Sequence, residues 1–164
     1  MGGRNPMALA LERMIAPVTG APARPFDAEA GSKLNVSVIF TSVHATLAAL
    51  KKARSLLGTQ AVSLGGHITL IVPQIVPYPL ALASPPVSVL SNERRLRVIA
   101  GDCRIDTSVC VYLCRDSLET LKSVLKPHSL VIVGSRKRWW PTAEKRLAAK
   151  LRSAGHEVIV TERD

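Results

Sequence analysis

The sequence predicts an α/β fold in which helices cover both faces of a parallel sheet, forming a three-layer α/β/α sandwich. Five short β-branched runs alternate with segments of helical periodicity, and parallel strands need crossover helices of this kind. Aromatic residues make up only 4% of the chain, so the core has to be aliphatic, which suits buried parallel strands. The 164 residues, 47% of them hydrophobic, are enough for one domain with a sizeable core.

Residues 1–33 are predicted to be a disordered tail that precedes the domain of residues 34–164. Alanine, proline and glycine dominate this stretch, and the prolines and glycines interrupt any periodic pattern. Order is predicted to begin at residues 35–40, a β-branched run that is typical of a strand.

A helix is predicted to follow this first strand. A spacing of three to four residues, which places side chains on one face of a helix, connects Leu47, Leu50, Ala53 or Arg54, and Leu57. Gly58 comes directly after the last of these leucines, where it would end the helix in the left-handed conformation.

The second strand is predicted at residues 67–72, and Pro73 would close it because proline has no donor for the ladder. The proline-rich segment up to Pro86 is predicted to be a long surface loop. No charged residue occurs from Ile68 to Leu90, but the prolines there would each remove a backbone donor that hydrocarbon does not replace. We therefore expect no membrane span.

The middle of the chain predicts a helix, a strand and a second helix. Residues 87–100 fit either a helix or an alternating strand, and we interpret them as a helix. The third strand is predicted at residues 107–114. A capping-box pattern follows at residues 116–119 and starts a helix that ends at Pro127. This helix is predicted to bury three leucines, Leu118, Leu121 and Leu125.

The carboxyl-terminal part predicts a strand, a loop, a helix and a last strand. The fourth strand is predicted at residues 129–133 and stops at a Gly134-Ser135 turn. The last helix is predicted from about Thr142 to Ala154, and the fifth strand at residues 157–161.

The chain carries a formal net charge of +10, and much of it lies in the segment 136–152. This segment has seven Lys or Arg against the single Glu144, a net charge of +6. Such a patch attracts phosphate, nucleic acid or an anionic membrane surface, or is a solvated helix face. The three cysteines cannot all pair within one chain and show no Cys-x-x-Cys motif, so we expect a reducing compartment. The amino terminus also lacks an apolar signal core. We therefore predict a cytoplasmic protein.

The predicted binding residues follow the fourth strand, because open parallel sheets bind ligands beyond the carboxyl ends of their strands. Gly134 and Ser135 would contact a phosphate, or would form a plain turn. Arg136, Lys137 and Arg138 would supply positive charge, since guanidinium groups bind phosphate through two hydrogen bonds.

The first strand would contribute the opposite wall of this site through Thr41 and Ser42, although Ser42 also suits an N-cap of the following helix. Trp139 and Trp140 would stack on nucleic-acid bases if exposed, or would pack over the sheet edge. The acidic residues and histidines are dispersed along the chain, so we predict no catalytic residues and no metal site.

Residues 35–162 resemble the universal stress protein family, a branch of the adenine-nucleotide α-hydrolase-like fold. The run Leu130-Val131-Ile132-Val133-Gly134-Ser135-Arg136 looks like the fourth strand and the start of the phosphate loop of that family. The run Glu157-Val158-Ile159-Val160 is similar to its fifth strand.

This resemblance implies the strand order 3-2-1-4-5, ATP or another adenine nucleotide as the ligand, and a homodimer formed through Val158, Ile159 and Val160 of the fifth strand. Of the glycines in the family's phosphate loop only Gly134 is present, and Lys137 stands at the second glycine position.

Three hypotheses about function follow from these observations. The first is a universal stress protein-like binding module, not an enzyme, whose crevice between the first and fourth strands accepts an adenine nucleotide or another anion. The second is a ligand-free, dimeric structural or interaction protein of the same fold. The third is nucleic-acid binding by the basic segment 136–152, which requires an affinity that falls steeply with salt.

Overall fold

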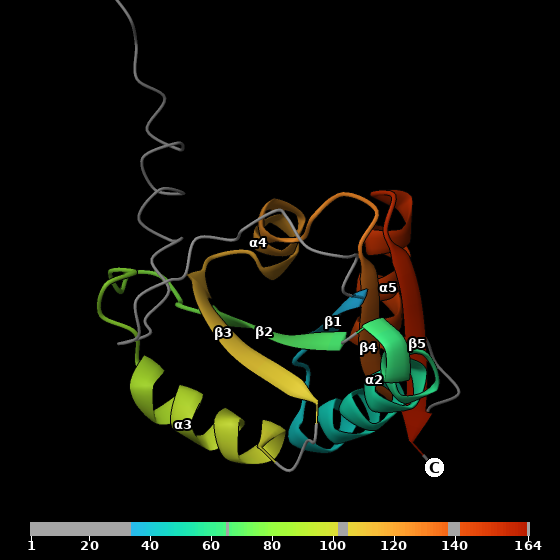
Figure 1. Ribbon diagram of the computed structural model, residues 1–164. Helices are drawn as coiled ribbons and strands as arrows, with labels where there is room; N and C mark the ends of the chain where they lie inside the picture. Colours follow the sequence, from blue (N-terminus) through green and yellow to red (C-terminus); the bar gives the residue numbers. More distant parts are fainter. Residues whose placement is uncertain (1–33, 65, 102–104, 138–141, 164) are drawn as a thin grey trace, which may run out of the picture.

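A computed structural model describes residues 34–64, 66–101, 105–137 and 142–163 of the chain. The predicted tail of residues 1–33 lies outside the described residues, as do Arg138, Trp139 and Trp140. Element labels follow Figure 1.

Five parallel strands form one sheet in the order β3-β2-β1-β4-β5, which confirms the predicted class and strand order (Figure 1). The central strand β1 pairs with β2 on one side and with β4 on the other. The strands are β1 (Leu34–Ile39), β2 (Gly66–Ile75), β3 (Asp106–Cys114), β4 (Leu130–Arg136) and β5 (Glu157–Arg163).

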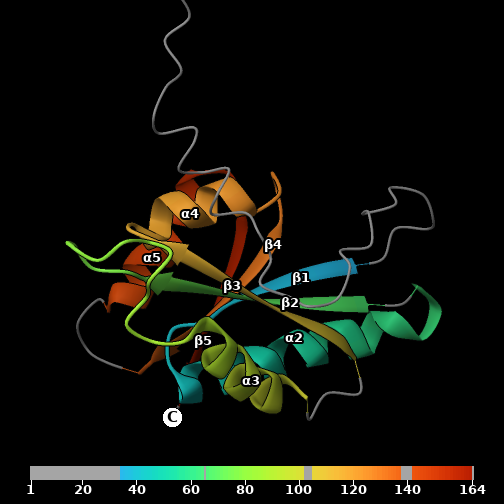
Figure 2. The ribbon, with the colours of Figure 1, turned by 90° about the vertical axis from the view of Figure 1, so that its left-hand side faces the viewer.

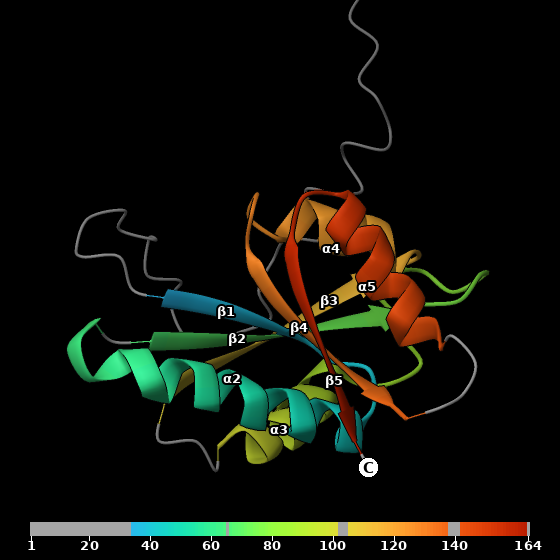
Figure 3. The same cartoon turned by 90° about the vertical axis from the view of Figure 1, so that its right-hand side faces the viewer.

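Within the described residues, four helices complete the predicted three layers, and two lie on each face of the sheet (Figures 2 and 3). Helices α2 and α3 cover one face, and α4 and α5 cover the other. Right-handed crossovers produce this arrangement when the chain first runs from β1 through β2 to β3 and then crosses back to β4 and β5 on the other side of β1. The helices are α2 (Val43–Leu64), α3 (Val89–Ala100), α4 (Ser117–Val124) and α5 (Ala143–Ser153).

Each face of the sheet has its own aliphatic core. Beneath α2 and α3, buried side chains that include Leu50, Leu70 and Ile132 pack together. Beneath α4 and α5, Ile39, Leu121 and Val133 belong to a second cluster. Successive strand residues alternate between the two clusters, so the near-continuous apolar runs of β1 and β4 fill both cores.

Helix α2 continues past Gly58 to Leu64, so the prediction that Gly58 ends it is wrong. A glycine inside a helix costs about 1 kcal/mol relative to alanine, too little to stop a helix that is anchored by buried side chains such as Leu50 and Leu57. Leu47, predicted to lie on the apolar face, has an exposed fraction of 43%.

Strand β2 runs through Pro73 to Ile75, so the predicted end at Pro73 is also wrong. The amide of Phe40 donates to the Ile71 carbonyl, which shows that odd-numbered residues of β2 direct their backbone groups toward β1. Strand β1 ends at Ile39, opposite Ile71. The missing donor of Pro73 therefore points past the end of β1, where no ladder bond is lost.

Strand β4 is longer than predicted, because Gly134, Ser135 and Arg136 pair in register with residues 161–163 of β5. The predicted turn at Gly134-Ser135 is therefore wrong. Strand β5 extends to Arg163, two residues beyond its predicted end at Thr161. Pairing with this longer β5 keeps residues 134–136 of β4 in the sheet.

Side-chain caps precede α3, α4 and α5 and fix where these helices begin. The Asp116 carboxylate accepts hydrogen bonds from the amides of Leu118 and Glu119, which confirms the predicted start of α4. The Thr142 hydroxyl accepts from the Lys145 amide at the start of α5. The Ser88 hydroxyl accepts from the Ser91 amide just before α3.

Strand β5 lies at one edge of the sheet, and its apolar side chains face the two cores. Val158 and Val160 belong to the cluster beneath α4 and α5, and Ile159 packs against the other cluster. The Arg152 guanidinium donates two hydrogen bonds to the Val158 carbonyl, so this backbone acceptor is already occupied. Pairing of two copies through β5 stays a prediction.

No helix within the described ranges has both the length and the apolar character that a membrane crossing requires. The uncharged stretch that begins at Ile68 forms most of β2 and the loop that follows it.

Candidate functional site

A crevice of about 510 Å³ opens at the carboxyl ends of β1 and β2, between the start of α4 and the length of α5. The chain leaves β1 for β2 on one side and later returns to β4 on the other, so the strand order reverses beside this crevice. Ligands of open α/β sheets bind at such a switch point. The sequence predicts the site between the first and fourth strands, whereas this crevice adjoins β1 and β2, and no residue of β4 lines it.

The floor and one wall of the crevice are apolar. Ile39 and Phe40 come from the end of β1, and Pro73 and Ile75 from the end of β2. Leu118 in the first turn of α4 and Leu147 on α5 complete this lining. A surface of this kind accepts a flat, weakly polar group such as an aromatic ring.

The charged lining of the crevice comes from α5 and from the cap of α4. Arg146 and Lys150 lie four residues apart, on one face of α5, and both are exposed. Glu144 and Asp116 also line the crevice. The Asp116 carboxylate is occupied by two amides of α4, so its charge offsets the positive end of that helix.

The other cations of α5 that the structure describes are directed elsewhere. Lys145 forms an ion pair with Glu162 of β5, and Arg152 donates to the Val158 carbonyl. Arg146 and Lys150 are therefore the basic side chains of α5 that a ligand in the crevice would meet.

Thr41 lines the crevice, as predicted, whereas its neighbour Ser42 does not line it and directly precedes α2. The Thr41 hydroxyl donates to the Gly134 carbonyl at 3.0 Å, which links the ends of β1 and β4. The Ser42 hydroxyl accepts from the Ala45 amide at 3.4 Å, which is the geometry of an N-cap. The capping interpretation of Ser42 is thus confirmed.

Gly134 and Ser135 lie within the sheet and do not line the crevice. A side chain on Gly134 would collide with the Ala45 carbonyl oxygen, so this glycine is required by the close approach of α2 to β4. The Ser135 side chain is buried, with its hydroxyl 3.0 Å from that of Thr142. Both residues therefore have structural roles in the described fold.

Arg136 and Lys137 are exposed at the end of β4 and do not line the crevice either. Arg136 pairs in register with Arg163 of β5. The remaining predicted cation, Arg138, lies outside the described residues.

Sequence reasoning missed Arg146 and Lys150 as site residues, although it included them in the basic segment. The signal was present, because the two cations and the intervening Leu147 share one side of a predicted helix. What the sequence lacks is the direction in which that side points, which depends on how α5 packs against β4 and β5.

The described residues contain no group of three or more His, Cys, Asp or Glu side chains placed to hold a metal ion. The crevice itself contributes only two carboxylates, and that of Asp116 is occupied by the helix cap. Its chemistry is therefore that of apolar contacts and side-chain cations.

No family model matches this sequence, and no curated protein matches it either.

Proposed function

We propose that the crevice binds a phosphate-bearing ligand, with an adenine nucleotide as the first candidate, as in the universal stress proteins that the sequence resembles. The observation that carries this proposal is the pairing of an apolar pocket with two adjacent cations at the switch point of the sheet. Neither feature alone selects a nucleotide, but an aromatic base with an anionic tail needs both.

The size of the crevice suits such a ligand. Its volume of about 510 Å³ lies within the range of roughly 300–1,000 Å³ that is usual for small-molecule pockets. The base would lie against Phe40, Pro73 and Leu118, which are part of the apolar lining. The phosphates would then extend along α5.

We expect the positions of the two cations, and not the net charge of the lining, to favour phosphate at this site. Arg146 and Lys150 are balanced in number by Asp116 and Glu144. Asp116 keeps its charge while one of its oxygens accepts from two amides of α4, so the formal charges of the lining sum to zero and the phosphate contacts depend on where the two cations lie. Arg146 offers two parallel donors to one phosphate.

This proposal keeps the predicted ligand class and the end of β1, but it replaces the end of β4 with α5 as the part that holds the phosphate. Gly134 and Ser135 have structural roles, and we assign the phosphate contacts to Arg146 and Lys150, with Thr41 on the facing wall.

Isothermal titration of ATP tests the proposal with two matched double variants. We expect Arg146→Ala with Lys150→Ala to weaken binding at least about 10-fold, since hydrogen bonds to charged groups are worth about 1.5–3 kcal/mol each. The control, Arg94→Ala with Lys51→Ala, removes the same two residue types from exposed positions on α3 and α2. It should leave the affinity unchanged.

Two results would contradict this assignment. Equal losses in both double variants would show that only net charge matters. Loss of binding in Arg136→Ala with Lys137→Ala, with none in the α5 variant, would move the phosphate contacts to the end of β4.

A further inference from the structure

Three side chains form a continuous hydrogen-bonded line at the amino ends of β2 and β3, far from the crevice in the sheet. The Asp106 carboxylate lies 3.0 Å from Nδ1 of His67, and Nε2 of the same ring lies 2.9 Å from the Ser108 hydroxyl. The register explains this meeting, because His67 stands opposite Asp106 and Ser108 follows two residues later on the same face.

This line lies on the face of the sheet that α4 and α5 cover only in part. Tyr112, on the same side of β3 as Ser108, packs into the core beneath those helices, near the carboxyl end of the strand. Figures 2 and 3 show α4 and α5 over that end, whereas α2 runs beneath the sheet toward the start of β1. Around the line, Ser37 and Thr69 are half-buried polar residues. Parallel strands that are buried on both faces carry apolar residues at such positions. The polar residues here therefore indicate a part of the sheet that α4 and α5 leave open.

One tautomer of a neutral His67 satisfies both hydrogen bonds of the line. An ionised carboxylate only accepts, so Nδ1 of His67 carries the proton that faces Asp106. Nε2 is then unprotonated in the neutral ring, and the Ser108 hydroxyl donates to it. A serine whose proton points at an oriented imidazole is the arrangement of nucleophile, base and orienting group used in acyl transfer.

The free edge of β3 provides a donor for the oxygen of a substrate. The Val76 amide, just after β2, donates to the Cys114 carbonyl of β3. Backbone groups of successive strand residues point to alternate sides, so the even-numbered residues of β3 direct theirs toward β2. Odd-numbered residues, Val109 among them, direct their amides outward, and β3 has no further neighbour among the described strands. The Val109 amide thus lies next to Ser108, as the amide after the nucleophile does in an oxyanion hole.

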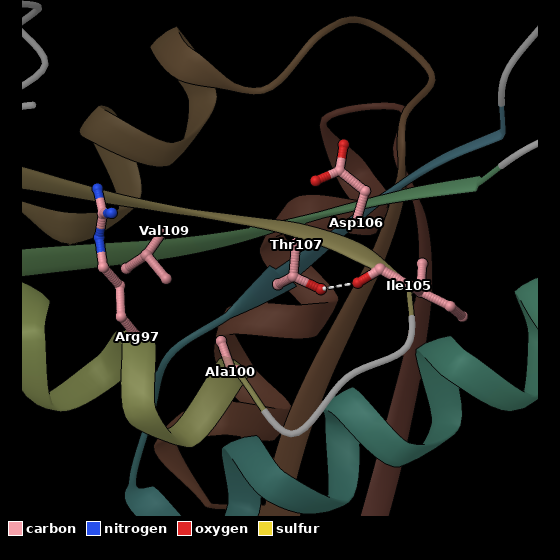
Figure 4. Close-up of a pocket in the computed structure, with 7 residues that line it drawn as sticks. Arg97, Ala100, Ile105, Asp106, Thr107 and Val109 are labelled. Carbon is pink, nitrogen blue, oxygen red and sulfur yellow. Dashed lines mark hydrogen bonds between the residues drawn. The ribbon is translucent and has the colours of Figure 1, made fainter. Parts of the chain in front are cut away.

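A hollow of about 380 Å³ lies along the same edge, between the end of α3 and the start of β3 (Figure 4). Arg97, Ala100, Thr107 and Val109 are among the residues that line it. Figure 4 shows the Asp106 carboxylate directed away from Ala100 and Thr107, toward the other face of the strand. A group bound across the edge would therefore reach both the hollow and the polar line.

We propose that this edge is an acyl-transfer site for small carboxylic esters, with Ser108 as nucleophile, His67 as general base and Asp106 as a positioning residue. Ser108 Oγ forms a bond to the ester carbonyl carbon while its proton moves to His67 Nε2. The Val109 amide stabilises the resulting oxyanion. The ester C–O bond then breaks, and His67 returns the proton to the leaving alcohol.

Water completes the cycle by attacking the acyl group on Ser108 while His67 takes one of its protons. The carboxylic acid leaves, and Ser108 recovers its proton from His67. Cys110, the next residue on this face, does not compete as a nucleophile, because burial raises the pKa of its thiol and keeps it protonated at neutral pH.

Labelling with a fluorophosphonate, in which the serine oxygen displaces fluoride from phosphorus, tests the nucleophile directly. We expect mass spectrometry of the full chain to find the probe on Ser108, and we expect Ser108→Ala and His67→Ala to abolish this label. Ser123→Ala, at an exposed serine of α4, is the matched control and should leave the label in place. Absence of label on Ser108 in the wild-type protein would overturn the proposal.

Hydrolysis of p-nitrophenyl acetate tests the whole reaction. We expect Ser108→Ala and His67→Ala to lower kcat at least about 10²-fold, which is the usual contribution of general base catalysis. Asp106 is 86% exposed, so Asp106→Asn should lower kcat less, with KM unchanged, and Asp106→Glu should recover part of the loss. Circular dichroism should show that each variant is folded. A wild-type rate equal to that of Ser108→Ala would contradict the proposal, and ATP binding in the distant crevice would be unaffected by that outcome.

Discussion

Replacing Gly134 with alanine is expected to lower the free energy of unfolding by about 3 kcal/mol or more, or to prevent folding. The new Cβ would overlap the carbonyl oxygen and carbonyl carbon of Ala45, which belong to the first turn of α2. Backbone atoms do not turn aside as a flexible side chain does. The helix would have to move away from β4, and Thr41, whose hydroxyl donates to Gly134, would move with it.

Gly58→Ala is the matched control for this substitution. A Cβ at Gly58 meets no atom within 4 Å, and the residue lies inside α2. Alanine is better than glycine in a helix interior by about 0.5–1 kcal/mol, so this variant should be more stable than the wild type. Urea denaturation of both variants measures the two free energies. A Gly134→Ala variant as stable as the wild type would refute the close approach of α2 to β4.

The second large effect is expected for Leu121→Ala, which should lower the free energy of unfolding by about 2–5 kcal/mol. Leu121 has an exposed fraction of 0% and lies in the core beneath α4 and α5. Helix α4 has only 8 residues, of which Thr120 and Leu121 are buried, so this leucine is its main apolar anchor. Loss of the anchor would also loosen the Asp116–Leu118 wall of the crevice.

Leu90→Ala removes the same atoms from α3, where the leucine is 55% exposed, and should change stability by about 0.5 kcal/mol at most. Thermal and urea unfolding compare the two variants. Because α4 forms one wall of the crevice, Leu121→Ala should also weaken ATP binding, whereas Leu90→Ala should not. Equal stability of the two variants would show that α4 is not held as described.

The order of elements was predictable because it depends on local patterns. Five β-branched runs and the helical segments between them gave the class, and the family resemblance gave the strand order, which the sheet confirms. The capping box at residues 116–119 also depends on neighbouring residues only, and the start of α4 was predicted from it.

Element ends were less predictable, because distant parts of the chain decide them. Pro73 is compatible with a strand only because β1 has already ended beside it. Gly134 suits a turn or a close approach of another backbone, and the helix that approaches begins near residue 43. Nothing near Gly134 in the sequence distinguishes these two possibilities.

The same limit applies to the candidate sites. Thr41 was placed correctly because the end of a strand is a local feature. The direction of Arg146 and Lys150, and the meeting of His67 with Asp106 and Ser108, follow from strand order and register. His67 and Asp106 looked dispersed along the chain, and Ser108 was not considered; the pairing of β2 with β3 brings the three together.

The central claim is that a ligand binds between the end of β1 and the cations of α5, and nuclear magnetic resonance tests it most directly. Titration of ATP into the ¹⁵N-labelled protein should shift the amide signals of Thr41, Leu118, Arg146 and Leu147, which line the crevice. Signals from Arg94 on α3 should stay in place. Shifts confined to Arg136 and Lys137, or no shifts at saturating ATP, would contradict the account.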